Sequence, residues 1–302
     1  MPDNAVVVLG GSGLVGSRVL ELWDEDGQAR PIAPTHADLD VLNAGALKVF
    51  LNQTDAPIVL NLAAWADVDA AEAERGDLQG RVYALNAIHP DRLANACGEL
   101  GKYLIHVSTD YVFDGTSAER PYREGDPTHP LGWYAETKHV GERRVLDSGA
   151  RSCVVRIEMP FTARAHPRSD FTRICLRRFQ AGESILGVED QRITPVFLDD
   201  VVYALRLIAA ERLTGIVHVA AADWTTPYRF ARSIAHRLGL DTGLVQPAEF
   251  KIFMATRAAP RPQHSWLDVS LFADVFGQHV LRTPEAQLDA WINQLATAPS
   301  RA

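Results

Sequence analysis

The 302-residue sequence has little of what marks secreted, disulfide-rich or metal-dependent proteins. Its three cysteines, Cys97, Cys153 and Cys175, are widely spaced and form no CxxC pair, so we expect buried structural thiols, with no disulfide framework. None of the ten histidines belongs to an HExxH motif, so zinc hydrolysis has no support. No metal site is predicted.

Long apolar runs and basic tracts are also missing. No run approaches the roughly 20 apolar residues of a membrane helix. Met1 leads directly into a short apolar segment, without the basic region and cleavage site of a signal peptide, so we expect a cytoplasmic protein with no membrane partner. The net charge is −8 and basic residues occur only in short groups such as Arg143-Arg144. Because nucleic acid is bound by clustered positive charge, it is not an expected partner.

The first half of the sequence alternates short apolar runs with helical patterns. The expected strands are 5–9, 30–33, 58–63, 102–107 and 153–157, and the expected helices are 14–23, 44–52, 82–100 and 134–146. Near-continuous apolar strands separated by helices predict a parallel sheet covered on both faces. The fold class is therefore α/β, with the doubly wound parallel sheet of a Rossmann fold.

The pattern loosens after residue 157. Further expected elements are a loop at 160–169, helices at 171–180, 199–210, 227–238 and 284–295, and strands at 196–198 and 216–219. We predict an NAD(P)-binding domain over residues 1–157, with 196–220 returning to it. The segments 158–195 and 221–302 are expected to form most of a smaller, partly discontinuous substrate lobe.

A glycine-rich turn joins the first expected strand to the first expected helix. The turn satisfies both GxGxxG and GxxGxxG, and it lies between a strand and a helix as a dinucleotide site requires. Glycine lets the backbone approach a pyrophosphate, and the helix N-terminus supplies free N–H groups. An ordinary glycine-rich turn is the alternative. The predicted cofactor contacts here are Gly10, Gly13, Leu14, Val15 and Gly16.

The end of the second expected strand bears on the choice between NAD and NADP. An acid at this place binds the adenosine ribose hydroxyls of NAD. The sequence here is Ala33-Pro34-Thr35-His36-Ala37, with no acid at the strand end and Arg30 nearby. Thr35 and His36 would accommodate a 2′-phosphate, so NADPH is favoured. If His36 is only a polar loop residue, NADH is usable as well.

Tyr134 and Lys138 form a YxxxK motif on an expected helix. The i,i+4 spacing places phenol and ammonium on one face. An adjacent cation lowers the pKa of a phenol from its ordinary value of about 10 and suits it to acid–base work. A strand ending in Ser108-Thr109 precedes the motif, and a hydroxyl at a strand end can polarise a carbonyl oxygen.

Several segments together resemble the dTDP-4-dehydrorhamnose reductases, which belong to the extended short-chain dehydrogenase/reductase superfamily. The run HVSTDYVFDG at 106–115 resembles the family's STDYVFDG, and PLGWYAETK at 130–138 with Gly141-Glu142 resembles its PxxxYGxTKxxGE. NLAAWADVDAAE at 61–72 resembles NxAAYTxVDxAE, and Leu39-Asp40-Val41 resembles the LD(I/V) that packs on adenine. Arg261-Pro262 with Ser265 and Leu267 resembles the RPxxSxL element.

The resemblance implies roles for individual residues. Tyr134 would donate a proton to the carbonyl oxygen while NADPH delivers hydride, Lys138 would hold the nicotinamide ribose and lower the tyrosine's pKa, and Thr109 would hydrogen-bond the reacting oxygen. Further cofactor contacts would be Asp40, Val41, Ala63, Ala64 and Trp65, and substrate contacts would be Val68, Ser108, Asp110, Tyr111, Met159 and Arg261. A packing role is the alternative for Ala64, Val68, Tyr111 and Phe113. Asn86 matches a family asparagine, and the alternative for it is a position on a helix surface.

One segment departs from the family pattern. Where the family has a TSWVY-like run, this sequence has Ile157-Glu158-Met159-Pro160-Phe161, so Met159 replaces a tryptophan and Glu158 brings a charge close to the pocket. In the loop that follows, Arg164 or Arg168 would bind a diphosphate, or the loop is a solvated basic segment. The family's acid-rich dimer contacts are not recognisable, and a homodimer is left open.

Three functions remain in competition. The first is NADPH-dependent reduction of the keto group of a nucleotide-linked 4-keto-6-deoxy sugar. The second is a sugar epimerase or dehydratase of the same superfamily, disfavoured because dehydratases need an added acid pair and no Glu stands beside Asp110 in the sequence. The third is a non-catalytic dinucleotide-binding regulator, like the regulatory subunit of methionine adenosyltransferase. Thr109, Tyr134 and Lys138 together favour an enzyme.

Overall fold

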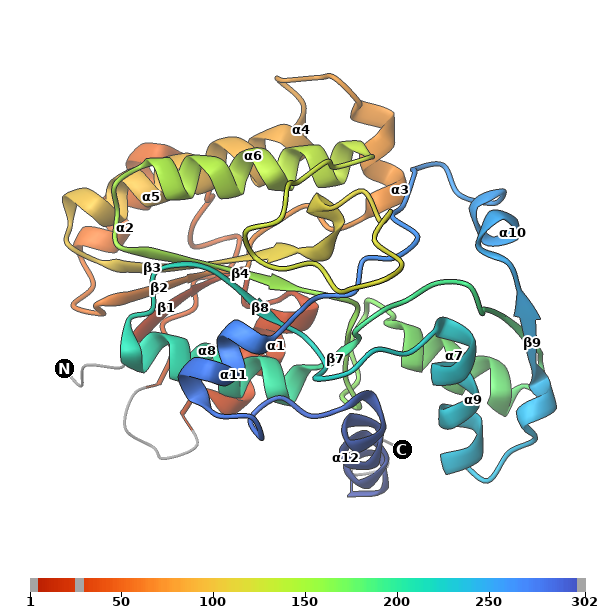
Figure 1. Cartoon of the computed structure of the whole chain (residues 1–302). Helices are drawn as coiled ribbons and strands as arrows, with labels where there is room; N and C mark the ends of the chain where they lie inside the picture. Colours follow the sequence, from red (N-terminus) through yellow and green to blue (C-terminus); the bar gives the residue numbers. More distant parts are fainter. Residues whose placement is uncertain (1–4, 25–29, 298–302) are drawn as a thin grey trace.

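A five-stranded parallel sheet forms the centre of the computed structural model, which describes residues 5–24 and 30–297. The strand order is β1-β2-β3-β4-β8, with β1 Val6–Leu9, β2 Ile58–Asn61, β3 Tyr103–Thr109, β4 Ser152–Ile157 and β8 Gly215–Val219. Every residue of the first four strands is buried. Helices cover both faces, which explains the near-continuous apolar character of these strands. The predicted α/β fold class is confirmed (Figure 1).

Alternate residues of the strands pack into two separate cores. Val6 and Val8 face a core on one side of the sheet, whereas Val7 and Leu9 face a core on the other side. This alternation follows from the two-residue repeat of a strand. The helices on the first side are α1 Leu14–Leu22, α8 Leu198–Glu211 and α11 Ser270–Phe276, and those on the second are α2 Ala44–Asn52, α5 His89–Glu99 and α6 Trp133–Asp147 (Figure 1).

Two expected elements differ in the structure. The expected strand at 30–33 is reduced to a single bridge between Ile32 and Val7, because the flanking Pro31 and Pro34 have no N–H to donate. The expected long helix at 82–100 is divided into α4 Arg81–Tyr83, a π-helical segment at Ala84–Ile88, and α5. Single π segments are frequent at functional sites.

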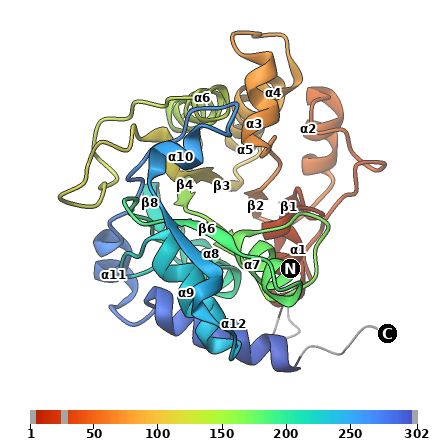
Figure 2. The same cartoon turned by 90° about the vertical axis from the view of Figure 1, so that its right-hand side faces the viewer.

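A smaller group of elements lies beyond the carboxyl ends of the strands (Figures 1 and 2). It contains two parallel strand pairs, β5 Pro160–Phe161 with β7 Val196–Phe197 and β6 Ile185–Val188 with β9 Val245–Ala248. Its helices are α7 Phe171–Gln180, α9 Pro227–Arg237, α10 Phe250–Met254 and α12 Pro284–Thr297, and it has its own apolar core, which includes Phe161, Phe197, Phe230 and Trp291. β6 and β9 were missed because each is short and interrupted by Gly187 or Pro247. The short remaining helices are α3 Val68–Ala71, η1 Glu72–Glu74, η3 Asp110–Val112 and η4 Thr242–Leu244.

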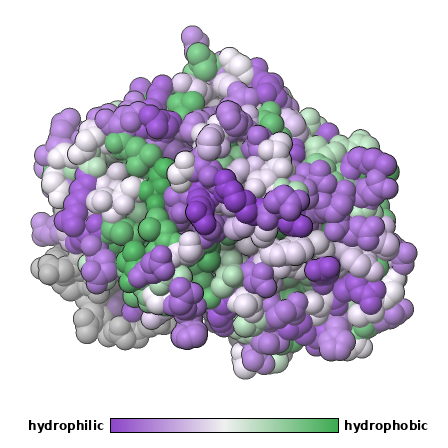
Figure 3. Space-filling view, in the orientation of Figure 1, coloured by the Kyte–Doolittle hydropathy of each residue, from purple (hydrophilic) through white to green (hydrophobic). Residues whose placement is uncertain are grey.

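The surface is mainly hydrophilic on the face drawn in Figure 3. Apolar side chains gather on the left of that view, around the position of α11, where Leu271 and Val275 are 41% and 47% exposed. In the described part of the chain, no helix combines the length and apolar character needed to cross a membrane.

Candidate active site

The glycine-rich turn is closed so tightly that two of its positions admit no side chain. Gly10 has φ 84°, and a Cβ there would lie 2.6 Å from the backbone nitrogen of Ala63. A Cβ at Gly16 would lie 2.2 Å from the carbonyl oxygen of Gly10. No side chain caps the N-terminus of α1 at Gly13, which leaves its first N–H groups open to an anion. Leu14 and Val15 are partly exposed in that first turn, so the turn fits a dinucleotide pyrophosphate.

An acid, Asp38, lies close to the second expected strand, although none stands at the strand end itself. The carboxylate of Asp38 accepts hydrogen bonds from the backbone N–H of Thr35 at 2.9 Å and from its hydroxyl at 2.7 Å. These two bonds hold the pKa of Asp38 below its ordinary value, and the bond from the Thr35 hydroxyl has the larger effect. Thr35 is therefore already engaged, and His36 and Arg30 are the exposed groups left for a 2′-phosphate.

Two buried asparagines shape the wall opposite the glycine turn. Asn61 accepts a hydrogen bond from Ala63 N at 3.2 Å, and Asn86 accepts one from Trp65 N at 2.8 Å. Asn86 also donates to Trp65 O and to Thr137 Oγ1, both at 3.1 Å. Asn86 is fully buried, so it is not a helix-surface residue. Instead it ties the expected cofactor wall, including Ala64, to α6.

A buried histidine pair, which the sequence did not single out, supports this wall. His89 contacts Asn61 Oδ1 and the carbonyl oxygen of Val41, and His106 contacts Asn61 Nδ2, all at 3.1 Å. Burial lowers the pKa of His89 to about 4 and that of His106 well below its ordinary value. Both rings are therefore neutral at pH 7 and link β2 and β3 to the segment around Val41. The exposed Asp40 accepts from Leu42 N at 3.0 Å.

Thr109, Tyr134 and Lys138 meet where β3 ends and α6 begins. Lys138 Nζ donates to the carbonyl oxygen of Val107 at 2.7 Å, and burial lowers its pKa to about 8. Burial raises the pKa of Tyr134 to about 12, against the opposing effect of the Thr109 hydroxyl that faces it. The expected lowering by Lys138 is therefore not found in this structure. At neutral pH the phenol keeps its proton, the state that a proton donor requires.

Ser108 points away from Tyr134, because successive strand residues face opposite sides of a sheet. Burial alone would raise the pKa of the Glu142 carboxyl. The Ser108 hydroxyl, His139 and Arg156 stabilise its ionised form instead, and they bring this pKa down to about 2. Arg156 and Glu142 form a buried ion pair at 2.8 Å that joins β4 to α6. This geometry does not support Ser108 as a substrate contact.

Asp110 and Glu158 lie together beneath the candidate site, although they are far apart in the sequence. The Thr109 hydroxyl donates to Asp110 Oδ1 at 3.0 Å, and Glu158 accepts from Thr194 N at 2.7 Å and from Ser265 Oγ at 2.8 Å. Burial raises the pKa of Glu158 to about 7, and burial together with the charge of Glu158 raises that of Asp110 well above its ordinary value. No Glu stands beside Asp110 in the sequence, but the fold brings Glu158 close to it.

The other predicted substrate contacts are spread over three environments. Tyr111 packs edge-on against Tyr134, with ring centroids 6.1 Å apart. Arg261 forms two hydrogen bonds with Asp69, at 2.9 and 2.8 Å, and lowers the pKa of the Asp69 carboxyl to about 2. The charge of Arg261 is therefore already engaged, next to the partly exposed Val68 of α3.

Two further side chains are part of the packing. Met159, at φ 41°, packs on the core of the smaller group of elements. Phe113 stacks on Tyr122 with centroids 4.2 Å apart, which is packing.

The loop that carries Arg164 and Arg168 lies over the glycine turn. His166 Nε2 contacts the carbonyl oxygen of Ser12 at 3.1 Å. Arg164 pairs with Glu21 at 3.6 Å, whereas the charge of Arg168 acts to lower the pKa of Tyr134. Of the two arginines, Arg168 is therefore the one whose charge reaches the candidate site. Within residues 5–24 and 30–297, no three His, Cys, Asp or Glu side chains are grouped as a metal site would need.

The sequence profile of the RmlD substrate binding domain family matches residues 4–297. A dTDP-4-dehydrorhamnose reductase of Mycobacterium tuberculosis is 33% identical over 301 residues, covering 98% of this chain and 92% of its own. The chain belongs to the RmlD family. This confirms the resemblance stated from its motifs, and with it the prediction of an oxidoreductase.

Two further similar proteins bear on the competing functions. The crystal structure of a dTDP-4-dehydrorhamnose reductase from Bacillus anthracis in complex with NADP has a TM-score of 0.86 and 25% identity, covering 96% of this chain and 99% of its own. The methionine adenosyltransferase 2 subunit beta of Xenopus laevis is 27% identical over 283 residues, covering 89% of this chain and 82% of its own.

Proposed function

We propose that the protein uses NADPH to reduce the 4-keto group of a nucleotide-linked 6-deoxy sugar, with Tyr134 as the proton donor. The observation that carries the proposal is the meeting of three groups where β3 ends and α6 begins: the Thr109 hydroxyl faces the Tyr134 phenol, and the Lys138 ammonium is held on the Val107 carbonyl oxygen. The reductase and NADP-complex names of the relatives support the substrate class and the cofactor.

Bound NADPH supplies the hydride, and the chain's own residues do the rest. The open N–H groups after Gly13 hold the pyrophosphate, and Asn86 keeps Trp65 in the cofactor wall. The single Thr109 hydroxyl proton, which points to Asp110 in this structure, turns to the carbonyl oxygen when the sugar binds, and Tyr134 gives that oxygen its proton. The Lys138 ammonium then stabilises the tyrosinate. Most of 158–195 and 221–302 forms the substrate lobe over this site, although α11 packs on the large sheet, and 1–157 with 196–220 form the dinucleotide domain.

A substrate panel tests the proposal directly. Purified protein is mixed with NADPH and with nucleotide 4-keto-6-deoxy sugars that differ in base and in ring stereochemistry, and absorbance of the reduced cofactor is followed. Oxidation of NADPH with one of these sugars, and formation of the matching deoxy sugar, is the expected result. Tight NADPH binding without turnover of any of them would overturn the proposal and favour a regulatory protein, the alternative raised by the methionine adenosyltransferase subunit.

The dehydratase and epimerase alternative is not strengthened by Glu158. A dehydratase acid–base pair must reach the sugar, whereas the Asp110 and Glu158 side chains are 3% and 2% exposed. Glu158 is also held by Thr194 and Ser265.

A homodimer is the assembly that we propose. The exposed Leu271 and Val275 of α11 favour it, since exposed apolar side chains that gather on one face are typical of interaction surfaces. Sedimentation equilibrium measures the assembly.

A further inference from the structure

Asp110 and Glu158 form a buried carboxyl pair that proton donation by Tyr134 does not itself require. The polar groups around the pair are hydroxyls and one backbone N–H, from Thr109, Ser265 and Thr194. Among the described residues, neither carboxyl forms an ion pair with an Arg, Lys or His side chain. Two neighbouring carboxylates without a cation repel each other, so the pair keeps at least one proton at neutral pH.

The pair stands in a row of groups that both donate and accept protons, in which hydrogen bonds join Thr109 to Asp110 and join Ser265 and Thr194 to Glu158. At one end, the Thr109 hydroxyl faces the Tyr134 phenol and donates to Asp110 Oδ1. The Ser265 hydroxyl donates to Glu158 Oε1, and it also lowers the pKa of Asp110 by stabilising its ionised form. Asp110 Oδ2 is buried without a hydrogen-bond partner among the described side chains, which leaves it open to carry a proton.

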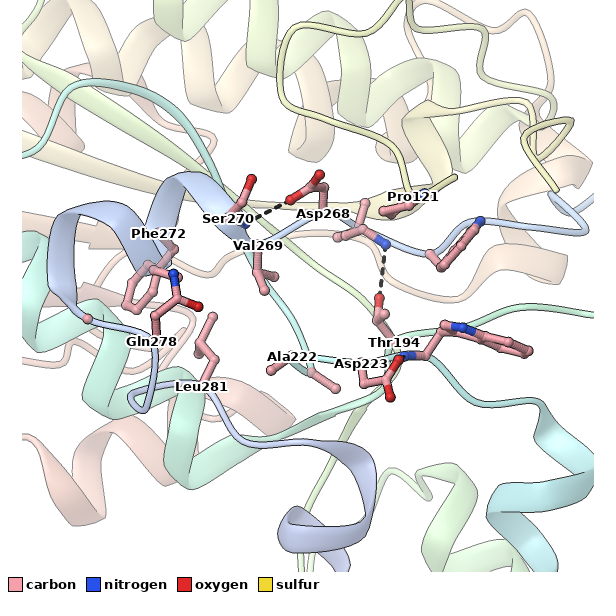
Figure 4. Close-up of a pocket in the computed structure, with 16 residues that line it drawn as sticks. Pro121, Thr194, Ala222, Asp223, Asp268, Val269, Ser270, Phe272, Gln278 and Leu281 are labelled. Carbon is pink, nitrogen blue, oxygen red and sulfur yellow. Dashed lines mark hydrogen bonds between the residues drawn. The ribbon is translucent and has the colours of Figure 1, made fainter. Parts of the chain in front are cut away.

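The far end of the row reaches a cavity. The Thr194 hydroxyl donates to Glu158 Oε2, and Thr194 lines a cavity of about 260 Å³ together with residues such as Asp223, Asp268 and Leu281 (Figure 4). Since liquid water occupies about 30 Å³ per molecule, the cavity has room for several waters. Neither Tyr134 nor Lys138 lines it. A proton therefore has a route from this cavity to Tyr134 that avoids the side where sugar and nicotinamide would lie.

We propose that Asp110, Ser265 and Glu158 return a proton to Tyr134 after each turnover, by way of Thr109, and take it up from the cavity behind Thr194. The proposal rests on the proposed function, because it requires that Tyr134 gives up a proton. Glu158 lies in the segment where this chain departs from the pattern of its family, so the relay would be confined to this chain and to relatives that have the same residue there.

Each transfer breaks one O–H bond and forms another. The tyrosinate takes the hydroxyl proton of Thr109, which takes the carboxyl proton of Asp110. Asp110 is reprotonated by Glu158 through Ser265, and Glu158 by water in the cavity through Thr194. One proton thus leaves bulk water for each proton given to the sugar, and no electron moves.

The groups around the pair suit a proton that moves near neutral pH. Burial raises the pKa of Glu158 to about 7. The titratable groups that face the pair are the phenols of Tyr111 on η3 and Tyr134 on α6, and Arg261 faces Tyr111. The segments carrying Thr194 and Ser265 present only hydroxyls and a backbone N–H to it.

Burst kinetics separate a relay from a structural role. In Glu158→Gln, Tyr134 starts protonated, so the first NADPH per site should be oxidised at the wild-type rate. Later turnovers should be about a hundredfold slower, the low end for lost proton transfer, whereas kcat/KM for sugar and NADPH should stay at the wild-type value. The isotope effect of 4-deuterated NADPH on steady-state kcat should fall toward 1, and the solvent isotope effect should rise. Ser265→Ala should behave alike.

Thr225→Val is the matched control for Thr194→Val. Thr225 is also buried, but its hydroxyl donates only to the Thr226 carbonyl oxygen at 3.5 Å. Thr194→Val should give the burst, and Thr225→Val should not. An infrared titration of the free protein should show a protonated-carboxyl band that is lost with a midpoint near pH 7, and Glu158→Gln should remove this titrating band.

Three results would overturn the relay. These are a first turnover in Glu158→Gln slowed as much as later ones, an undiminished NADPH isotope effect, or an infrared band that survives the substitution. Failure of the proposed function is a different outcome, because then the wild-type protein itself oxidises no NADPH with any nucleotide sugar.

Discussion

Asn86 binds both backbone groups of Trp65, accepting from its N–H at 2.8 Å and donating to its carbonyl oxygen at 3.1 Å. The same side chain donates to Thr137 on α6. A single amide thus joins the π-helical segment, the expected cofactor wall and the helix that carries Tyr134. Because Asn86 is fully buried, water cannot replace these hydrogen bonds when the amide is removed.

Asn86→Ala should therefore weaken NADPH binding. Loss of about 1.4 kcal/mol, the net value of one or two hydrogen bonds, corresponds to a dissociation constant about tenfold higher. Titration of NADPH fluorescence measures it. Asn95→Ala is the control, because Asn95 is exposed and its side chain bonds only Asp91. Equal NADPH affinity in both variants would contradict the role given to Asn86.

Gly16→Ala should disrupt the glycine turn. The new Cβ would lie 2.2 Å from the Gly10 carbonyl oxygen, a backbone atom that cannot move without opening the turn. We expect NADPH binding to fall by at least about tenfold, and the melting temperature to drop by several degrees. Gly125→Ala is the control, since a Cβ there meets nothing within 4 Å. A Gly16→Ala protein that binds NADPH normally would show that the pyrophosphate lies elsewhere.

Tyr134→Phe should lower kcat by at least about a hundredfold, the usual loss when a general acid is removed. The ring and its packing on Tyr111 remain, so NADPH affinity should stay within about twofold. Tyr203→Phe, on an exposed side chain of α8, should leave kcat unchanged. Steady-state rates and cofactor titrations on the three proteins suffice, and full activity of Tyr134→Phe would remove the phenol from the mechanism.

Activity should decline as pH rises through about 8. Burial favours the neutral form of Lys138 and lowers its pKa to about 8, so its ammonium is present below that pH and is lost above it. A neutral amine no longer stabilises the tyrosinate, and kcat/KM should fall on the alkaline side. Lys138→Arg, which stays charged, should not show this alkaline loss, whatever its absolute rate. The same alkaline limb in both proteins would contradict the assignment.

Asp38→Asn should increase the preference for NADPH over NADH. The native carboxylate repels a nearby 2′-phosphate and engages both donors of Thr35. Removing one charge is expected to change the ratio of kcat/KM values by about tenfold, as one repulsive contact of about 1.4 kcal/mol would. Asp77→Asn, on an exposed turn, serves as the control. An unchanged ratio would show that Asp38 does not face the adenosine ribose.

Local patterns were enough to predict much of the fold. The helices at Ala44–Asn52 and Phe171–Gln180 have the bounds expected from the sequence. Their apolar residues recur with helical spacing, and each begins after an Asn or Asp whose side chain caps the first turn. β6 and β9 could not be predicted in this way, because each is a four-residue strand stabilised by its partner from a distant part of the chain.

The sequence by itself determined the glycine turn, the YxxxK helix and the hydroxyl at the end of a strand, because in each the chemistry lies within a few neighbouring residues. Only the tertiary structure decided what surrounds them. It placed Glu158 beside Asp110 and Asn86 beside Trp65, and it turned Asp38 back onto Thr35. Burial decided the protonation of Tyr134 and Lys138, because the pKa of a side chain depends on the solvent and charges around it. Sequence spacing does not record those surroundings.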